Sequence, residues 1–318
     1  MTAKNNIKMT AYKSTKEKRR KTFWFFFAWL TLLFSLLISK DIATYVNEAL
    51  KLCANTVIAS VFPFLILTDL ISHTAGFQQI KFLRTCFERI FKINGYAINA
   101  FIIGITCGFP IGVKVASELY KNKKISKEEC QRLIGFSNNT GPAFIIAGIG
   151  MGMRASIKDG VILYLSMILS ALLVGLIFGR GKSYQKSLVE YSDESYDFSS
   201  SVRSAAINTL IVCGFVVLFS VICGTLSDLF KNNIFFSFLV PFIEVTNAAS
   251  MLAKSSFLPS FITLLLTSFA ISFSGISVHL QASSFLSETN ISMKKYYIMK
   301  LLQGFFSIIF TLIIITIT

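Results

Sequence analysis

The stretch that decides the fold of this chain is YAINAFIIGITCGFPIGVKVASELY, at residues 96–120. It is long enough to cross a bilayer, which takes about 20 apolar residues. The letters GFPIG interrupt it at residues 108–112. Because glycine and proline end regular helix, we expect two half-helices joined by a sharp turn. Such irregular backbone is tolerated at membrane depth only where protein buries it or where it lines a cavity.

The composition of the whole chain agrees with a membrane protein. Hydrophobic residues make up 53% of the 318 residues and charged residues 15%, against about 25% charged in an average soluble domain. This excludes a soluble globular enzyme, a disordered chain and a disulfide scaffold. We predict an all-α, polytopic helical membrane protein with about seven full spans and two or three broken or re-entrant ones. The clearest spans are expected at residues 23–39, 53–72, 161–178, 205–226, 234–252 and 298–318, and a second broken segment at 261–286.

Positive charge is concentrated at the N-terminus. Residues 1–22 carry eight Lys or Arg and one Glu, out of a net charge of +15 for the chain. A basic flank before an apolar run indicates a cytoplasmic N-terminus that contacts anionic lipid. No basic module with interleaved aromatic residues follows, so we expect no nucleic-acid partner. We predict a basic tail at 1–22, a first transmembrane half at 23–179, a polar linker at 180–203 and a second half at 204–318.

The two predicted halves resemble each other. PFLILTDLIS at residues 63–72 aligns without a gap on PFIEVTNAAS at 241–250, and GFPIGVK at 108–114 lies opposite GISVHLQ at 275–281. The interruptions therefore occur in the same order in both halves, which predicts two internal repeats. Paired broken segments are typical of transporters that bind solute between repeats. The reason is that half-helix ends expose unpaired N–H and C=O groups, which bind ions.

Ionisable residues inside apolar segments are costly and are therefore candidate functional residues. Lys114 follows the first break, where we predict that it binds an anionic group; the alternative is that it reaches to the membrane interface. Asp69, Glu244 and His279, with Asn247, are candidates for coupling or gating; the alternatives are a buried lysine partner and a packing residue. The other candidate solute-binding residues flank the breaks: Gly108, Pro110, Asn138, Asn139, Thr140, Gly275, Ser277 and Gln281. The asparagines alternatively cap a helix.

No pattern of enzyme chemistry is present. The chain lacks the H-E-x-x-H, G-x-S-x-G and Walker patterns, and its six cysteines form no C-x-x-C pair. GIGMG at residues 148–152 follows no predicted strand, so close packing of helices explains it better than phosphate binding. We therefore expect no enzyme activity, no cofactor and no metal site.

Several motifs together point to a family. GFPIGVKVASELY at 108–120, ISKEE at 125–129 and FSNNTGPAFI at 136–145 are followed by EVTN at 244–247, GISVHLQ at 275–281 and LQG at 302–304. They resemble the sporulation integral membrane proteins of the YlbJ type, which belong with the nucleoside-recognition or "Gate" domain proteins. The resemblance covers residues 54–304. It implies two gate-like repeats, related in design to concentrative nucleoside transporters, and a link to the passage of dipicolinate, a small aromatic dicarboxylate, towards the developing spore.

Residues and resemblance together predict a transporter or facilitator of a small organic anion, with dipicolinate as the candidate solute. The alternatives are a transporter of nucleosides or another small metabolite, and a membrane assembly factor for sporulation that transports nothing. The expected partners are a solute that bears a carboxylate and the lipid bilayer, with homo-oligomerisation open. The expected location is the cell membrane, and the resemblance implies a forespore membrane.

Overall fold

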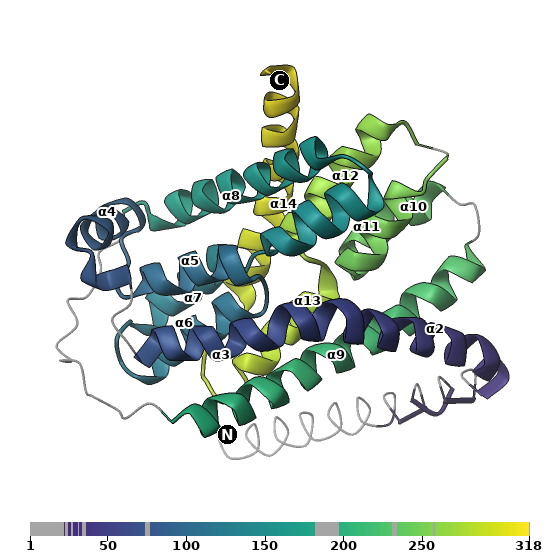
Figure 1. The fold of residues 1–318 in the computed structure, drawn as a ribbon, viewed down its shortest axis with the longest axis horizontal. Helices are drawn as coiled ribbons and strands as arrows, with labels where there is room; N and C mark the ends of the chain where they lie inside the picture. Colours follow the sequence, from purple (N-terminus) through teal and green to yellow (C-terminus); the bar gives the residue numbers. More distant parts are fainter. Residues whose placement is uncertain are drawn as a thin grey trace, which may run out of the picture.

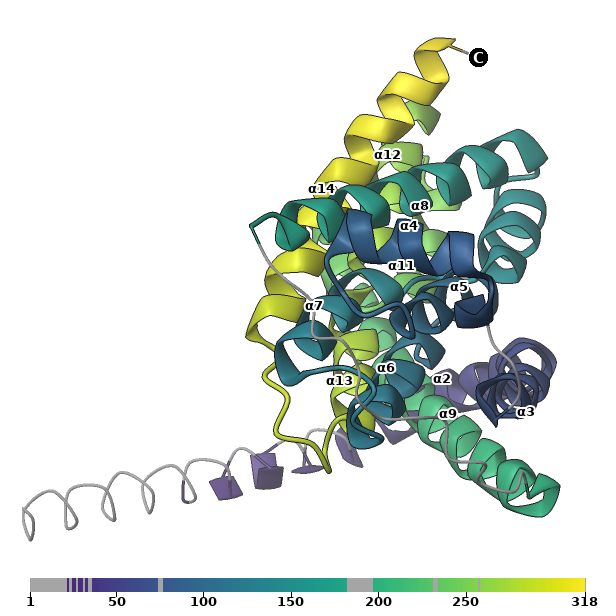
Figure 2. The same cartoon turned by 90° about the vertical axis from the view of Figure 1, so that its left-hand side faces the viewer.

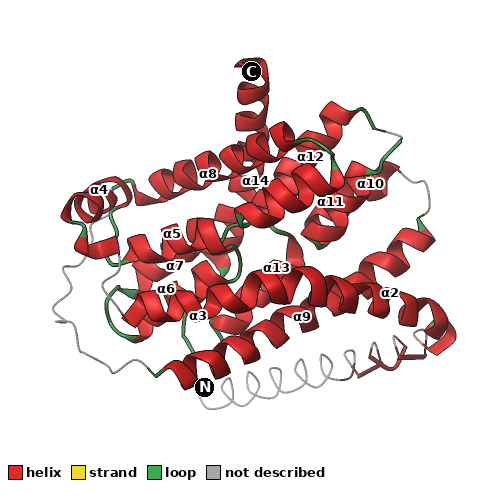
Figure 3. Ribbon diagram, in the orientation of Figure 1, coloured by secondary structure: helices red, strands yellow, loops and turns green. Residues whose placement is uncertain are grey.

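A computed structural model describes residues 22, 25–26, 28–30, 32–33, 36–73, 77–181, 197–230, 234–256 and 258–317. All regular structure in these residues is helical, and they contain no strand (Figure 3). Within the same residues, four helical stretches are long and apolar enough to cross a membrane: Ile157–Gly179, Phe198–Leu229, Ser260–Phe285 and Lys294–Ile317. The predicted all-α polytopic fold is thus confirmed.

The first half of the chain consists of short helices that lead to one long helix. In chain order they are α2 (Ser39–Leu52), the π-helical η1 (Cys53–Ile58), α3 (Ala59–His73), the 3₁₀ turn η2 (Phe77–Gln79), α4 (Lys81–Phe91), α5 (Ala97–Cys107), α6 (Ile111–Lys121), α7 (Lys127–Ser137), the π-helical η3 (Ala143–Met153) and α8 (Ile157–Gly179). The second half consists of α9 (Phe198–Leu229), α10 (Ile234–Ile243), α11 (Val245–Ala253), α12 (Ser260–Phe273), α13 (Gly275–Phe285) and α14 (Lys294–Ile317).

The predicted spans at 161–178, 205–226 and 298–318 correspond to α8, α9 and α14. The predicted continuous span at 234–252 is wrong, because the backbone of Glu244 is extended (φ −152°, ψ 129°) and separates α10 from α11. The interruptions within 96–120 and 261–286 are confirmed at Gly108 and Ser274. The basic tail up to residue 21, six residues of the span at 23–39 and most of the polar linker lie outside the described residues.

The helices form two outer groups with the broken segments between them (Figure 1). On one side α2 and α3 pack along α9, and on the other α8, α12 and α14 pack together. Helices α5, α6, α7 and α13 lie between these groups (Figure 1). The turned view shows α14 rising beside α12 to the C-terminus (Figure 2). Broken helices are therefore enclosed by protein on both sides, as irregular backbone requires.

Two local features of the fold depend on residues close together in sequence. Ser126 and Glu129 form the capping box that starts α7, and Glu129 Oε1 also accepts a hydrogen bond of 2.7 Å from the Asn94 amide. The GIGMG stretch packs closely, since a Cβ on Gly150 would lie 2.8 Å from the Cα of Gly160 in α8.

Candidate functional site

In the first half, two broken segments meet at their breaks. Gly108 has φ +88° and lies between α5 and α6, and a Cβ placed on it would lie 2.9 Å from the Gly141 amide nitrogen. Gly141 belongs to the break between α7 and η3. Any side chain at Gly108 would therefore push the two breaks apart.

The second half repeats this arrangement with other residues. Gly275 (φ +73°) begins α13, and a Cβ on it would lie 3.0 Å from the Ile243 carbonyl oxygen and 3.1 Å from the Glu244 amide nitrogen. In the order of elements, Gly108 therefore corresponds to Glu244, and the break at residues 138–141 corresponds to Ser274. The sequence alignment instead paired Gly108 with Gly275. Glu244 and Gly275 both lie at breaks, so spacing along the chain alone could not decide which of them corresponds to Gly108.

A cavity of about 440 Å³ lies where the breaks of both halves meet α3 and α9. Four of the predicted site residues line it: Gly108, Thr140, Glu244 and Gln281. The rest of its wall is mostly apolar and comprises Leu52, Val57, Val61, Phe64, Thr106, Cys107, Phe109, Gly141, Pro142, Ala143, Phe144, Ala147, Gly148, Val212, Val216, Thr246 and Val278. An apolar pocket with a few convergent polar groups is the usual form of a small-molecule site.

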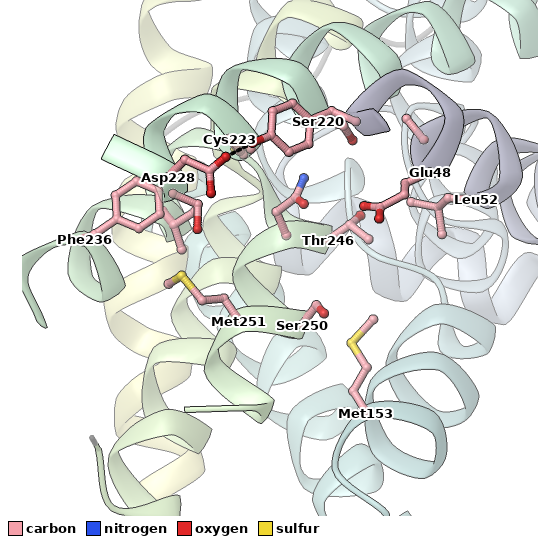
Figure 4. Close-up of a pocket in the computed structure, with 16 residues that line it drawn as sticks. Glu48, Leu52, Met153, Ser220, Cys223, Asp228, Phe236, Thr246, Ser250 and Met251 are labelled. Atoms are coloured by element: carbon pink, nitrogen blue, oxygen red, sulfur yellow. Dashed lines mark hydrogen bonds between the residues drawn. The ribbon is translucent and has the colours of Figure 1, made fainter. Parts of the chain in front are cut away.

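A second cavity of about 380 Å³ adjoins the first, because Leu52 and Thr246 line both. Figure 4 shows Glu48, Asp228 and Ser250 around it, and the Asp228 carboxylate accepts a hydrogen bond from the Tyr45 hydroxyl. Among the described residues that line the two cavities, none is a lysine or an arginine. Side-chain cations thus supply no charge to either cavity.

Two polar side chains mark the larger cavity. Glu244 is buried, and its Oε2 accepts hydrogen bonds from the Asn247 amide (2.6 Å) and the Asn247 Nδ2 (2.8 Å), so it caps the start of α11. Gln281 is 2% exposed; its Nε2 donates a long bond of 3.4 Å to Ser277 Oγ, and its Oε1 has no partner. A buried polar atom without a partner costs free energy. This half of the Gln281 amide is therefore available to a bound solute.

The start of η3 and residues close to the starts of α6 and α13 line the same cavity. α6 and η3 begin at residues that follow its lining residues Phe109 and Pro142, and α13 contributes Val278 and Gln281. None of these three helices has a side-chain cap, whereas α11 is capped by Glu244. The first turn of a helix leaves N–H groups unpaired and carries partial positive charge. In α6 the amides of Ile111 and Val113 already donate to the carbonyls of Gly108 and Pro110. The cavity therefore offers mainly the backbone donors at the start of η3 to an acceptor or an anion.

Lys114 and Asp69 do not line either cavity. The Lys114 Nζ lies 3.7 Å from Asp69 Oδ1 and 3.5 Å from Glu118 Oε1, and Asp69 also accepts a hydrogen bond from the Ser201 hydroxyl. Two residues that the sequence singled out for different roles are thus partners in one ion pair. The pair joins α6 to α3, and through Ser201 to α9.

Comparison with known proteins gives a relative of this chain by sequence. The chain is 26% identical to the sporulation integral membrane protein YlbJ of Bacillus subtilis (strain 168) over 316 aligned positions, which cover 84% of this chain and 76% of that protein. This similarity supports assignment of the chain to the YlbJ type. No family model and no solved structure matches it. The resemblance to Gate domain proteins stays a prediction, and the YlbJ-type chain is a multi-pass integral membrane protein.

A polar network adjoins the break at residues 138–141, and the sequence predicted only some of its members as site residues. Asn138 Nδ2 donates to the Tyr296 hydroxyl (2.9 Å), which also lies 3.1 Å from His279 Nδ1. Lys300 Nζ donates to the Asn138 carbonyl (2.8 Å), and Gln303 Nε2 donates to Asn139 Oδ1 (2.8 Å). The predicted Asn138, Asn139 and His279 therefore meet α14.

Sequence reasoning missed Lys300, Tyr296 and Gln303. Lys300 lies within the last predicted span, so the rule for ionisable residues in apolar segments would have identified it. Tyr296 and Gln303 carry no comparable signal, because uncharged polar residues are common on the packed faces of membrane helices.

Proposed function

We propose that this YlbJ-type chain is a transporter or facilitator that passes a small organic anion across the membrane. The observation that carries the proposal is that broken segments from both halves line one cavity of about 440 Å³. Solute sites of many transporters lie where discontinuous helices of two repeats meet. Dipicolinate is the first candidate solute, because the sequence resembles a family linked to its passage.

An anion suits the backbone of this site. The uncapped start of η3, where Ala143 and Phe144 line the cavity, supplies N–H donors without lysine or arginine. The apolar wall, with Phe109 and Phe144, suits an aromatic ring. Glu244 already caps α11, so its carboxylate is engaged by Asn247 and is placed to act in coupling or gating.

The proposal extends to the setting of the chain. The N-terminus lies in the cytoplasm, since the basic tail precedes the first apolar run. The protein lies in the cell membrane, and in a spore-forming bacterium in a forespore membrane. It carries no enzyme activity, needs no cofactor and binds lipid rather than nucleic acid; homo-oligomerisation is open.

Uptake of labelled dipicolinate into proteoliposomes tests the proposal. Ala147 lines the cavity, so Ala147→Phe fills it and is expected to lower uptake by about tenfold, the effect of some 1.4 kcal/mol. The matched control is Ala59→Phe in α3, at an exposed position that lines neither cavity. It is expected to keep wild-type uptake. Equal uptake by both variants, or none by the wild type, would contradict the proposal for this solute.

A neutral solute such as a nucleoside is a second candidate. The Glu244 carboxylate and the unpartnered Gln281 Oε1 are acceptors, and a nucleoside carries O–H and N–H donors whereas the dipicolinate dianion carries none. Competition of labelled dipicolinate uptake by unlabelled uridine or adenosine separates the two. An assembly factor that transports nothing would show no uptake of either solute and no effect of Ala147→Phe.

A further inference from the structure

The ammonium of Lys300 is completely buried beside the first break. Its side chain is 0% exposed, although it begins in the second turn of α14, near one end of a candidate span. A lysine at such a position commonly extends to the membrane interface. Lys300 instead points inward, since its Nζ donates to the Asn138 carbonyl and to Gln303 Oε1, each at 2.8 Å.

Both acceptors are neutral oxygens. Among the residues that the structure describes, no carboxylate oxygen lies within 4.0 Å of the Lys300 Nζ, whereas Lys114, Lys121 and Arg154 each have at least one. A buried cation without an anionic partner is costly. The buried Lys300 ammonium therefore needs a stabilising partner other than a carboxylate.

That partner is the end of α7. The helix ends at Ser137, and Asn138 is its C-cap, so the carbonyl bound by Lys300 lies at the negative end of a half-helix. The Gln303 amide is held in place by Asn139 Oδ1, at 2.8 Å. Carbonyls at unwound segments and half-helix ends are the ligands that bind Na⁺ in secondary transporters. A set of neutral oxygens of this kind suits a monovalent cation.

We propose that the Lys300 ammonium occupies a cation site at the break between α7 and η3. It takes the place that a dissociable monovalent cation would otherwise fill. The break needs positive charge because it gathers the C-terminal carbonyls of α7 within protein. Lys300 provides that charge from a side chain that is tethered to α14. The same break continues into Thr140, Gly141 and Pro142, which line the larger cavity. A consequence, which rests on the proposed function, is that solute uptake needs no coupling cation at this position.

Thermal unfolding of the detergent-purified protein tests the first part without any transport assay. The midpoint is measured in sodium, methylammonium and N-methylglucamine chloride at equal ionic strength. The wild type is expected to unfold within about 1 °C in all three salts. Lys300→Ala is expected to unfold at a lower temperature, and to recover about 2 °C or more in sodium or methylammonium relative to N-methylglucamine.

Lys295→Ala is the matched control. Lys295 lies in the first turn of the same helix and is exposed, so this variant is expected to behave as the wild type in every salt. Lys300→Met removes the charge but retains most of the side-chain volume. It leaves no room for an ion, and its midpoint is expected to be lowered equally in all three salts.

Two outcomes would overturn the proposal. One is selective stabilisation of the wild type by sodium, because the position would then be open to a dissociable cation. The other is a Lys300→Ala variant that shows no ion-specific recovery, which includes failure to yield folded protein in any of the three salts. Wild-type dipicolinate uptake that is equal in sodium, potassium and N-methylglucamine supports the consequence. Sodium-dependent uptake whose sodium dependence is lost in Lys300→Met contradicts it, because sodium would then act at this position. Absence of uptake in all three salts contradicts the proposed function and leaves the unfolding result in force.

Discussion

Lys114 shows how the neighbours of a charged residue determine its role. From its position past Pro110, the sequence predicted that it binds an anion. Its Nζ instead lies between the carboxylates of Asp69 and Glu118, at 3.7 and 3.5 Å, and its side chain is largely buried. These carboxylates already compensate its charge. The geometry favours a role in holding α3 against α6 over direct contact with solute.

Replacing Lys114 is therefore expected to affect stability more than solute binding. Lys114→Ala leaves the partly buried Asp69 without its cation and should cost about 2–3 kcal/mol of unfolding free energy. The double variant Lys114→Ala/Asp69→Asn should recover part of this loss, because the more deeply buried of the two carboxylates is then neutral. Thermal unfolding in detergent measures both. Lys121→Ala, which removes an exposed pair with Glu288, is the control and should change little.

Uptake decides between the two roles of Lys114. With protein that is folded and reconstituted in equal amounts, Lys114→Ala should retain most of the wild-type flux. A variant with wild-type stability and no flux would instead show that Lys114 acts on the solute, as the sequence predicted.

At the scale of elements, the α5–α6 hairpin closes on the end of α7 through two glycines. A Cβ on Gly104 would lie 1.8 Å from the Ser137 carbonyl oxygen, and one on Gly112 would lie 2.1 Å from the same atom. Both helices of the hairpin thus contact the C-terminal end of α7 closely. This contact keeps Gly108 next to Gly141, and both residues line the larger cavity.

Gly112→Ala is expected to force the hairpin away from α7. Overpacking in a close-packed contact costs about 1–3 kcal/mol, and here the clash is with backbone, which yields little. The control is Gly214→Ala in α9, where a Cβ meets no heavy atom within 4 Å. That variant should be neutral or more stable by up to about 1 kcal/mol, because alanine favours helix over glycine. Thermal unfolding of the two variants checks this. Equal midpoints would contradict a close contact between the α5–α6 hairpin and the end of α7.

At the scale of the whole molecule, both cavities lie between the group formed by α2, α3 and α9 and the broken segments of both halves. The larger cavity contains a native probe, since Cys107 lines it and has a free thiol of intermediate exposure. Cys130 is also free but is 0% exposed. Each cysteine therefore reports on a different environment.

Solute in the cavity is expected to protect Cys107 from alkylation. In a Cys86→Ser background, which removes another partly exposed thiol, a small maleimide should modify Cys107 and leave Cys130 unmodified in the folded protein. Dipicolinate at saturating concentration should slow the modification of Cys107 by about tenfold or more, as expected for a site occupied nine-tenths of the time. Mass spectrometry of peptides follows both residues. Equal rates with and without solute would place the binding site elsewhere.

Much of the fold could be predicted because it depends on local sequence. The apolar runs that became α8, α9 and α14 are long, and their length alone indicates a span. The breaks at Gly108 and Ser274 were predicted within one or two residues, because glycine and proline act on the backbone that carries them. The span at 234–252 was misjudged because Glu244 leaves helical geometry without glycine, and capping by its own side chain stabilises that change.

The candidate site was harder to predict from the sequence, because the residues that contact each other there are far apart along the chain. The sequence by itself determined that this is a helical membrane protein with two halves and interrupted segments, since composition and backbone breakers act locally. Only the tertiary structure decided which breaks meet, which places Glu244 and Gln281 at one cavity with Gly108 and Thr140. It likewise paired Lys114 with Asp69 and turned Lys300 inward onto the end of α7. The physical reason is that a buried charge is stabilised by whichever oxygens the packing of helices brings within about 3–4 Å, and spacing along the chain does not encode that packing.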